Sequence, residues 1–354
     1  MSLIRHFSRA LIGLTLLSAS AAHAAAPRCH IAWSHYTGWE PVGYIQDSGI
    51  AARWGKKMGV DLQFTLINDY IESVNQYTAG SFDGVTVTNM DGLTIPAVGG
   101  VDTTVLVVGD FSNGNDAILV KSADNKASVH SLKSKPVKLV ELSVSHYLLA
   151  RALDKNGMAE RDLSVVNTSD ADLGGLIAAA ADGDAFVTWN PIVMTALQQP
   201  GVVNVFDSAQ IPGEIIDTIM VRTDADDACK RAVTGAWYEA MGQMSQGGAK
   251  TQQALSSMAA QAGGSEAEFQ AQLRTTRMFY EPKQAAEFSR SQQLKDTMRF
   301  VAKFSFDHGL YGNGASDETF IGIAYPDGSV WGNADFVKLR FDATYMQMAA
   351  DGKL

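Results

Sequence analysis

Positive charge and cysteine are both scarce in this sequence. Of its 354 residues, 28 are Lys or Arg and 38 are Asp or Glu, so the formal net charge is −10. Nucleic acid is a poor partner for such a chain, because phosphate binding needs concentrated Lys and Arg. The two cysteines, Cys29 and Cys229, allow at most one internal disulfide, and the sequence leaves a bridge and two separate buried thiols equally open.

Long apolar runs are also missing. The run at residues 10–22 is shorter than the roughly 20 residues that a membrane-spanning helix needs. Arg5 and Arg9 precede this run and a small-x-small site at 22–24 follows it, which is the layout of a secretory signal peptide. We therefore expect residues 1–24 to be a cleaved signal peptide and the mature protein to work in the periplasm.

Recognisable catalytic and metal-binding motifs are absent from the sequence as well. It has no GxSxG elbow, HExxH pair, phosphate loop or CxxC pair, and its seven histidines lack metal-ligand spacing. The expectation is a binding protein that is not an enzyme and that uses neither a metal nor a cofactor.

Strand, loop and helix units recur along the chain, which predicts an α/β fold with parallel sheets covered by helices. A polar stretch near residues 120–134 marks a change of character. We expect one lobe from residues 25–118 and 222–354 and a second from 119–221. Two crossings between the lobes would leave a cleft lined by the carboxyl ends of strands, where such sheets bind ligands.

Three local predictions accompany this division. A single helix is expected over residues 42–58, only helices over 225–310, and a terminal helix over 336–354.

Polar and aromatic side chains gather in loops at the predicted strand ends. Each has an ordinary structural alternative: rings anchor loops, Thr and Asn cap helices, and an acid at a helix start complements the dipole. The candidate ligand-binding residues are Ser34, Tyr36, Trp39, Thr88, Asn89, Asp91 and Asp110 in the first lobe, Glu141, Trp189 and Asn190 in the second, and Asp217 on the return strand.

Four segments resemble a known family: WSHYTGWEPVGYIQDSGI, INDYIESVNQYTAGSFDGVTVTNMD, GGVDTTVLVVGDFSNGNDAI and AYPDGSVWGNADFVKLRFDATYM. They are similar to the periplasmic substrate-binding proteins of the nitrate/sulfonate/taurine ABC transporter class, and more narrowly to the subfamily encoded beside urea (guanidine) carboxylase. The resemblance spans essentially the whole mature chain. It implies a type II periplasmic-binding-protein fold, with two α/β lobes, a ligand cleft and two hinge crossovers, in a monomer that delivers a solute to ABC permease subunits.

The same resemblance implies guanidinium or urea as the solute, for nitrogen uptake. Guanidinium is favoured, because a planar cation with N–H donors around its edge suits the acids and rings among the candidates, whereas urea needs a donor for its carbonyl oxygen. Other readings remain open: another small amine or a sulfonate as solute, a sensor domain, an enzyme of the thiamine-pyrimidine synthesis type on the same fold, or a hydrolase with His35 or His146 as its base.

Overall fold

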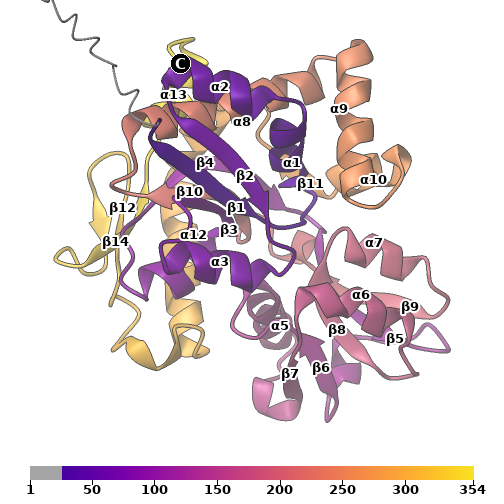
Figure 1. The fold of residues 1–354 in the computed structure, drawn as a ribbon. Helices are drawn as coiled ribbons and strands as arrows, with labels where there is room; N and C mark the ends of the chain where they lie inside the picture. Colours follow the sequence, from indigo (N-terminus) through magenta and orange to yellow (C-terminus); the bar gives the residue numbers. More distant parts are fainter. Residues whose placement is uncertain (1–25) are drawn as a thin grey trace, which may run out of the picture.

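The computed structural model describes residues 26–354, so the predicted signal peptide lies outside the described residues. Its strands form two sheets, each accompanied by helices, with the first sheet at the upper left of Figure 1 and the second at the lower right. No helix in the described part is both long and apolar enough to cross a bilayer. The predicted α/β fold with two sheets is confirmed.

The first sheet has nine strands, and its buried inner strand β4 helps to stabilise the sheet. From Thr103 to Asp110 every residue of β4 is buried, as the apolar run VLVV requires of a strand that is covered on both faces. In spatial order the sheet runs β13 (Val330–Trp331), β12 (Gly322–Ala324), β14 (Val337–Phe341), β4 (Thr103–Ser112), β10 (Ile216–Arg222), β3 (Gly84–Thr88), β1 (Arg28–Trp33) and β2 (Asp61–Leu66), and β11 (Thr276–Met278) pairs with β4.

The second sheet is built from one continuous part of the chain. Its spatial order is β7 (Ser164–Asn167), β6 (Pro136–Leu139), β8 (Ala185–Trp189), β5 (Asp116–Lys121) and β9 (Val202–Asp207). The chain therefore passes between the sheets at residues 113–115 and again at 208–215, a few residues from the predicted lobe boundaries at 118/119 and 221/222.

Helices flank both sheets. Those that follow strands of the first sheet include α3, whose buried Tyr70, Val74 and Tyr77 recur at helical spacing. With the first sheet go α1 (Glu40–Asp47), α2 (Ile50–Met58), α3 (Tyr70–Thr78), α4 (Asn89–Gly92), α8 (Asp227–Ser245), α9 (Gly248–Gln261), α10 (Glu266–Leu273), α11 (Pro282–Ser289), α12 (Gln292–Asp307) and α13 (Thr344–Ala350), and with the second α5 (Val144–Lys155), α6 (Asp170–Ala178) and α7 (Ile192–Leu197).

The sheets are mixed rather than parallel. β10 runs antiparallel to both of its neighbours, β3 and β4, because it brings the chain back from the second sheet, and β5 runs antiparallel to β8 and β9. β10 also lies in the first sheet, although the prediction gave most of its residues to the second lobe.

The three local predictions need correction. The helix expected over 42–58 is divided into α1 and α2 at Gly49, whose φ of 74° is a left-handed conformation that glycine adopts readily. The three-residue strand β11 interrupts the helices of 225–310, and the expected terminal helix begins as strand β14. The sequence VKLRF in β14 alternates apolar and polar residues with period two, which is a strand signal that the helical reading overlooked.

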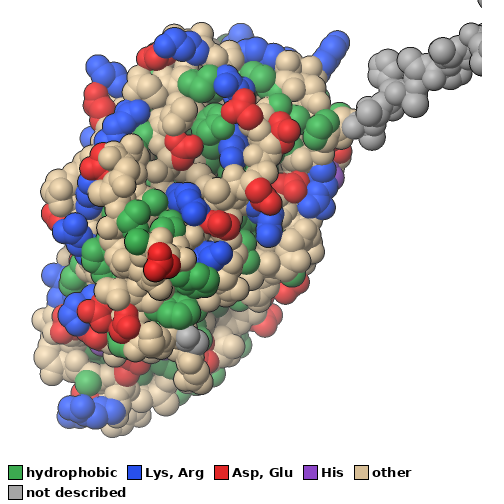
Figure 2. Space-filling view, turned by 90° about the vertical axis from the view of Figure 1, so that its left-hand side faces the viewer, with side chains coloured by type: hydrophobic (Ala, Val, Ile, Leu, Met, Phe, Trp, Pro, Cys, Tyr) green, Lys and Arg blue, Asp and Glu red, His purple; other side chains and the backbone are tan. Residues whose placement is uncertain are grey.

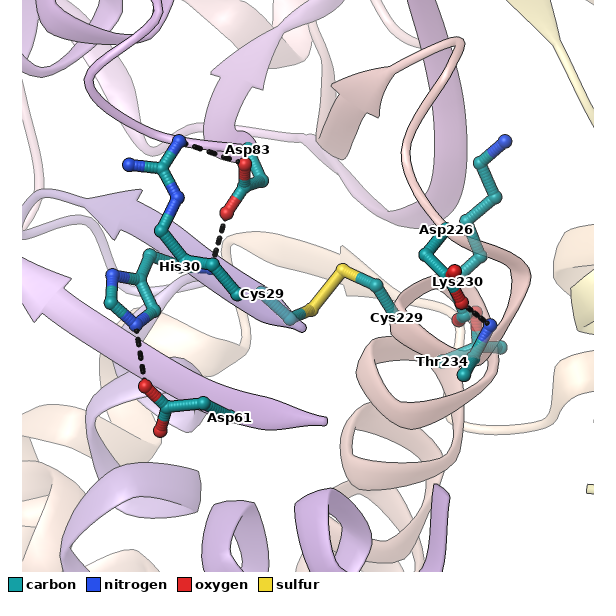
Figure 3. Close-up of a disulfide and its surroundings, with 10 residues drawn as sticks. Cys29, His30, Asp61, Asp83, Asp226, Cys229, Lys230 and Thr234 are labelled. Atoms are coloured by element: carbon teal, nitrogen blue, oxygen red, sulfur yellow. Dashed lines mark hydrogen bonds and ion pairs between the residues drawn. A yellow bond between two sulfur atoms is a disulfide. The ribbon is translucent and has the colours of Figure 1, made fainter. Parts of the chain in front are cut away.

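The two cysteines form a disulfide. Figure 3 shows Cys29 of β1 joined to Cys229 of α8; their Cα atoms are 5.4 Å apart and their sequence separation is 200. The bridge therefore ties the first strand of the sheet to the helix that follows the return strand.

Candidate functional site

A small cavity lies where the ends of the two sheets meet. The space in it that is free for a water-sized sphere is about 10 Å³, close to what one water molecule needs. Five of its lining residues come from the elements of the first sheet and three from those of the second: Tyr36, Trp39, Tyr70, Thr88 and Asp217, and Asp116, Val144 and Trp189.

Strand register places the polar lining residues. Asp217 of β10 pairs with Thr88 of β3 on one side and with Asp110 of β4 on the other, so these three residues form a row across the first sheet. In the second sheet Asp116, the first residue of β5, pairs with Trp189, the last residue of β8. The cavity thus lies between two rows of side chains set by strand pairing.

Four aromatic rings make the apolar part of the wall. The centroid distances are 5.1 Å from Tyr36 to Trp39, 5.5 Å from Trp39 to Tyr70 and 5.5 Å from Tyr70 to Trp189. All four side chains are buried. The rings form a continuous chain of neighbours along the cavity wall, three from the first lobe and one from the second.

The two tyrosine hydroxyls are directed to buried carboxyl groups behind the rings. The Tyr36 hydroxyl donates to Asp110 Oδ1 at 3.1 Å, and the Tyr70 hydroxyl donates to Asp91 Oδ2 at 2.6 Å. Asp91 Oδ2 also accepts from the backbone N–H of Val144 at 3.2 Å, a contact between the two lobes. A phenol that donates to a carboxyl group has a more electron-rich ring, so both rings are well suited to face a cation.

Four aspartate carboxyl groups are buried in and around the cavity: Asp91, Asp110, Asp116 and Asp217. Burial raises the pKa of Asp116 to about 7 and the pKa of Asp91 to about 6. The pKa values of Asp110 and Asp217 are raised by burial, and that of Asp217 also by the neighbouring Asp110 carboxyl group. Near neutral pH this cluster therefore holds protons that exposed carboxyl groups release.

No basic side chain balances these acids. Among residues 26–354, none of the four carboxyl groups takes part in an ion pair with Lys, Arg or His. The outer surface differs, since on the face in Figure 2 Lys and Arg are interspersed with Asp and Glu. A buried charge without a partner is costly, so the cluster is suited to a state in which something positive lies against it.

The first crossover is fixed by an asparagine that the sequence prediction did not select. Asn115 donates through Nδ2 to the Tyr36 hydroxyl at 3.2 Å and to Thr276 Oγ1, and its Oδ1 accepts from Asn190 at 2.6 Å and from Thr275 at 2.8 Å. These bonds connect the crossover, the end of β8, the segment around β11 and the cavity wall.

The structure brings most of the predicted residues together. Tyr36, Trp39, Thr88, Trp189 and Asp217 line the cavity, and Asp91 and Asp110 lie directly behind two of its rings.

Four other candidates lie elsewhere. Asn89 holds the second crossover, where it donates to the Glu214 carbonyl and accepts from Ile216 N–H, and Asn190 bonds to Asn115. Ser34 is buried but does not line the cavity. Glu141 is exposed, because β6 ends at Leu139 and the residue lies in the following turn, so the structure does not bring it to the cavity.

Three lining residues were missed. Asp116 follows the turn-forming residues Asn113, Gly114 and Asn115 and opens an apolar strand, and Val144 has no polar signal. Tyr70 follows the helix cap Asp69 at the end of a predicted strand, which is a position where a cleft residue is expected.

Comparisons with solved structures identify the fold. The alkanesulfonate-binding protein SsuA of Xanthomonas axonopodis pv. citri matches with a TM-score of 0.65 and 16% identity, over 82% of this chain and 96% of that one. The aliphatic sulphonate-binding protein SsuA of Escherichia coli gives 0.63 and 16% over 82% and 95%, and the nitrate-binding protein NrtA of Synechocystis PCC 6803 gives 0.56 and 13% over 93% and 99%. The molecule therefore has the fold of the periplasmic binding proteins.

Sequence comparison gives the family. The model of the NMT1/THI5-like family matches residues 51–230, just over half of the chain. The chain belongs to the NMT1/THI5-like family. No curated protein matches it significantly in sequence.

Proposed function

We propose that this protein is the periplasmic solute-binding component of an ABC importer and that its solute is a small organic cation, guanidinium before any other. The observation that supports this most is the set of four buried aspartates, without a basic partner among the described residues, around a chain of four rings. The fold and the family support the role as a binding component.

The charge of the cavity argues against an anionic solute. The similar structures include proteins named for sulfonates and nitrate, which are anions. An anion in this cavity would lie beside Asp116 and Asp217, with no Lys or Arg among the lining residues to hold it. A buried anion without a positive partner is costly, whereas a cation favours the ionised form of these carboxyl groups, so we infer that this chain takes cationic solutes.

The chemistry of the cavity favours guanidinium over urea. In-plane N–H groups of guanidinium can donate to the carboxyl groups of Asp116 and Asp217 while its face lies on a ring. Urea carries no charge to offset the charge that these acids develop when they ionise, and against ionised carboxyl groups its carbonyl oxygen finds no donor.

Closure of the two lobes around the solute follows from the origin of the lining residues. Asp217 and three of the rings belong to the first lobe, and Asp116 and Trp189 to the second. A solute held by both sets stabilises the closed state by its extra contacts there. We also place the protein in the periplasm, because its fold is that of the periplasmic binding proteins and the expected signal peptide would export it.

The hydrolase reading finds little support at the histidines. His35 Nδ1 lies 2.8 Å from the buried Glu40 carboxyl group, and His146 Nδ1 accepts from the backbone N–H of Leu142 at 3.1 Å. Neither histidine lines the cavity. The protein is therefore proposed to bind its solute without converting it.

Calorimetric titration of the mature protein tests the proposal. We expect guanidinium to bind and urea, taurine and nitrate to bind at least tenfold more weakly or not at all. Tight binding of taurine or nitrate would overturn the charge argument. Binding of urea in preference to guanidinium would overturn the choice of solute, and turnover of any of the four would overturn the assignment as a binding protein.

A further inference from the structure

Two helices from different lobes meet end to end beside the cavity. Helix α3 begins at Tyr70 and follows a strand of the first sheet, and helix α6 begins at Asp170 in the second lobe. Each is capped by the residue before it: Asp69 Oδ1 accepts from Glu72 N–H at 2.9 Å, and Ser169 Oγ accepts from Ala171 N–H at 3.3 Å. These are ordinary N-caps within each lobe.

The caps also bond to each other across the lobes. The Ser169 hydroxyl donates to Asp69 Oδ2 at 2.6 Å, and the Tyr70 N–H donates to Asp170 Oδ1 at 3.1 Å. Asp170 of one helix thus accepts from the first N–H of the other, and the two N-cap side chains bond to each other. We call these two contacts the cap latch.

The cap latch offsets the repulsion between two helix N-termini that face each other in the closed form. Helix N-termini carry partial positive charge, so two that face each other repel unless negative groups lie between them. Asp69 and Asp170 provide those groups, one from each lobe. Asp170 is buried with 6% of its surface exposed, and burial raises the pKa of its carboxyl group to about 6. Separation of the lobes would return this carboxyl group to water and leave the Tyr70 N–H without its acceptor.

Tyr70 joins the latch to the cavity. Its backbone N–H bonds to Asp170, its ring lines the cavity, and its hydroxyl donates to Asp91. A solute that contacts this ring therefore acts on the residue that the second lobe holds through the latch.

From this geometry we propose that Ser169 and Asp170 are positioning residues that set the affinity for the solute by holding the closed state through Asp69 and Tyr70. They do so without touching the solute. The solute readout of this proposal rests on the proposed function, whereas the latch itself has a readout that needs no solute.

That readout is hydrogen exchange at the Tyr70 amide, followed by NMR. As the first residue of α3, Tyr70 has no acceptor within its own helix for its N–H, so protection of this amide must come from Asp170. We expect a protected amide in the unmodified protein and at least a tenfold faster exchange in Asp170→Ala. The matched control is Asp172→Ala, an exposed acid in the same first turn of α6, which should leave exchange within twofold.

Affinity for guanidinium gives the second readout. We expect a fivefold to twentyfold loss in Asp170→Ala, a partial rescue in Asp170→Asn because the amide oxygen can still accept, and less than a twofold change in Asp172→Ala. Equal exchange and equal affinity in the two alanine variants would overturn the latch. If guanidinium fails to bind any variant while Tyr70 loses protection only in Asp170→Ala, the latch stands and the proposed solute is wrong.

Discussion

The half-buried acid at the second crossover and the buried acids of the cavity differ in whether a basic side chain pairs with them. At the second crossover, the Glu214 carboxyl group accepts from Arg151 Nε at 2.8 Å and Nη2 at 2.9 Å, and from the Tyr147 hydroxyl at 2.7 Å. The Arg151 guanidinium also lies over Phe300 and Phe304, 4.7 Å and 5.2 Å from the ring centroids. This crossover therefore contains a guanidinium group held by a carboxylate and two rings, and a tyrosine donates to the same carboxylate.

The cavity has the same partners but no guanidinium. It offers carboxyl groups, tyrosine hydroxyls and rings, and none of its lining residues is basic. At the second crossover the chain itself supplies the cation that pairs with the acid, whereas no residue that lines the cavity is basic. We infer from this contrast that the solute supplies the cation at the cavity, in contacts like those that Arg151 makes.

Removal of the Arg151 guanidinium, which pairs with Glu214, should have the largest of the expected effects, a loss of stability. Arg151→Met leaves Glu214 partly buried without a partner, and we expect a loss of about 3 kcal/mol in the free energy of unfolding. Thermal unfolding followed by circular dichroism measures it. Arg151→Lys keeps the charge without the planar fork and should lose less. An unchanged unfolding temperature in Arg151→Met would remove the contrast between the two groups.

Removal of an acid from the cavity should weaken solute binding without lowering stability. Asp217→Asn is expected to weaken guanidinium binding by about 2–3 kcal/mol, because a charge-assisted hydrogen bond is lost in a buried site. The unfolding temperature of the free protein should not fall, since the variant removes a charge that had no partner. A destabilised variant that binds normally would show that Asp217 is structural.

The buried aspartates of the cavity should also make the stability of the protein depend on pH. The pKa values of Asp116 and Asp91 are raised, so the folded protein holds protons that the unfolded chain has released, and this contribution lowers stability as pH rises from about 4 to about 7. Thermal unfolding across this range should show a shallower slope in Asp116→Asn than in the unmodified protein. Saturating guanidinium should raise the unfolding temperature more at pH 8 than at pH 5. A shift that is larger at pH 5 contradicts the account.

The smallest effect is expected at Glu141. This exposed side chain does not line the cavity, so Glu141→Gln should change guanidinium affinity by less than twofold in calorimetry. A loss comparable to that of Asp217→Asn would show that the turn after β6 moves into the site.

How far the sequence predicts this site depends on the kind of residue. Tyr36, Trp39 and Trp189 were predictable because large rings beside a strand end are unusual in a solvated loop. The place of Asp217 was not predictable in this way, because only strand pairing shows that it lies between Thr88 and Asp110. No local pattern carries that information.

Glu141 and Asp116 also show that the sequence alone does not reveal which acids reach the cavity. Both are acids next to an apolar strand, and the sequence alone favoured Glu141. The strand β6 ends two residues before Glu141, whereas β5 begins at Asp116 and pairs it with Trp189. The fold class followed from repeated local units, while the site depends on where strands end and on which strands are neighbours.

We propose that the positive charge of the solute pairs with the buried aspartates of the cavity. The number of protons released on binding measures this pairing. Calorimetric titration with guanidinium at pH 6.5, in two buffers that differ in ionisation enthalpy, gives the number of protons released. Because a cation favours the ionised form of carboxyl groups with raised pKa values, we predict release of roughly one proton per guanidinium bound, falling towards zero by pH 9. Binding with no proton release at either pH, or no binding of guanidinium, would contradict the claim.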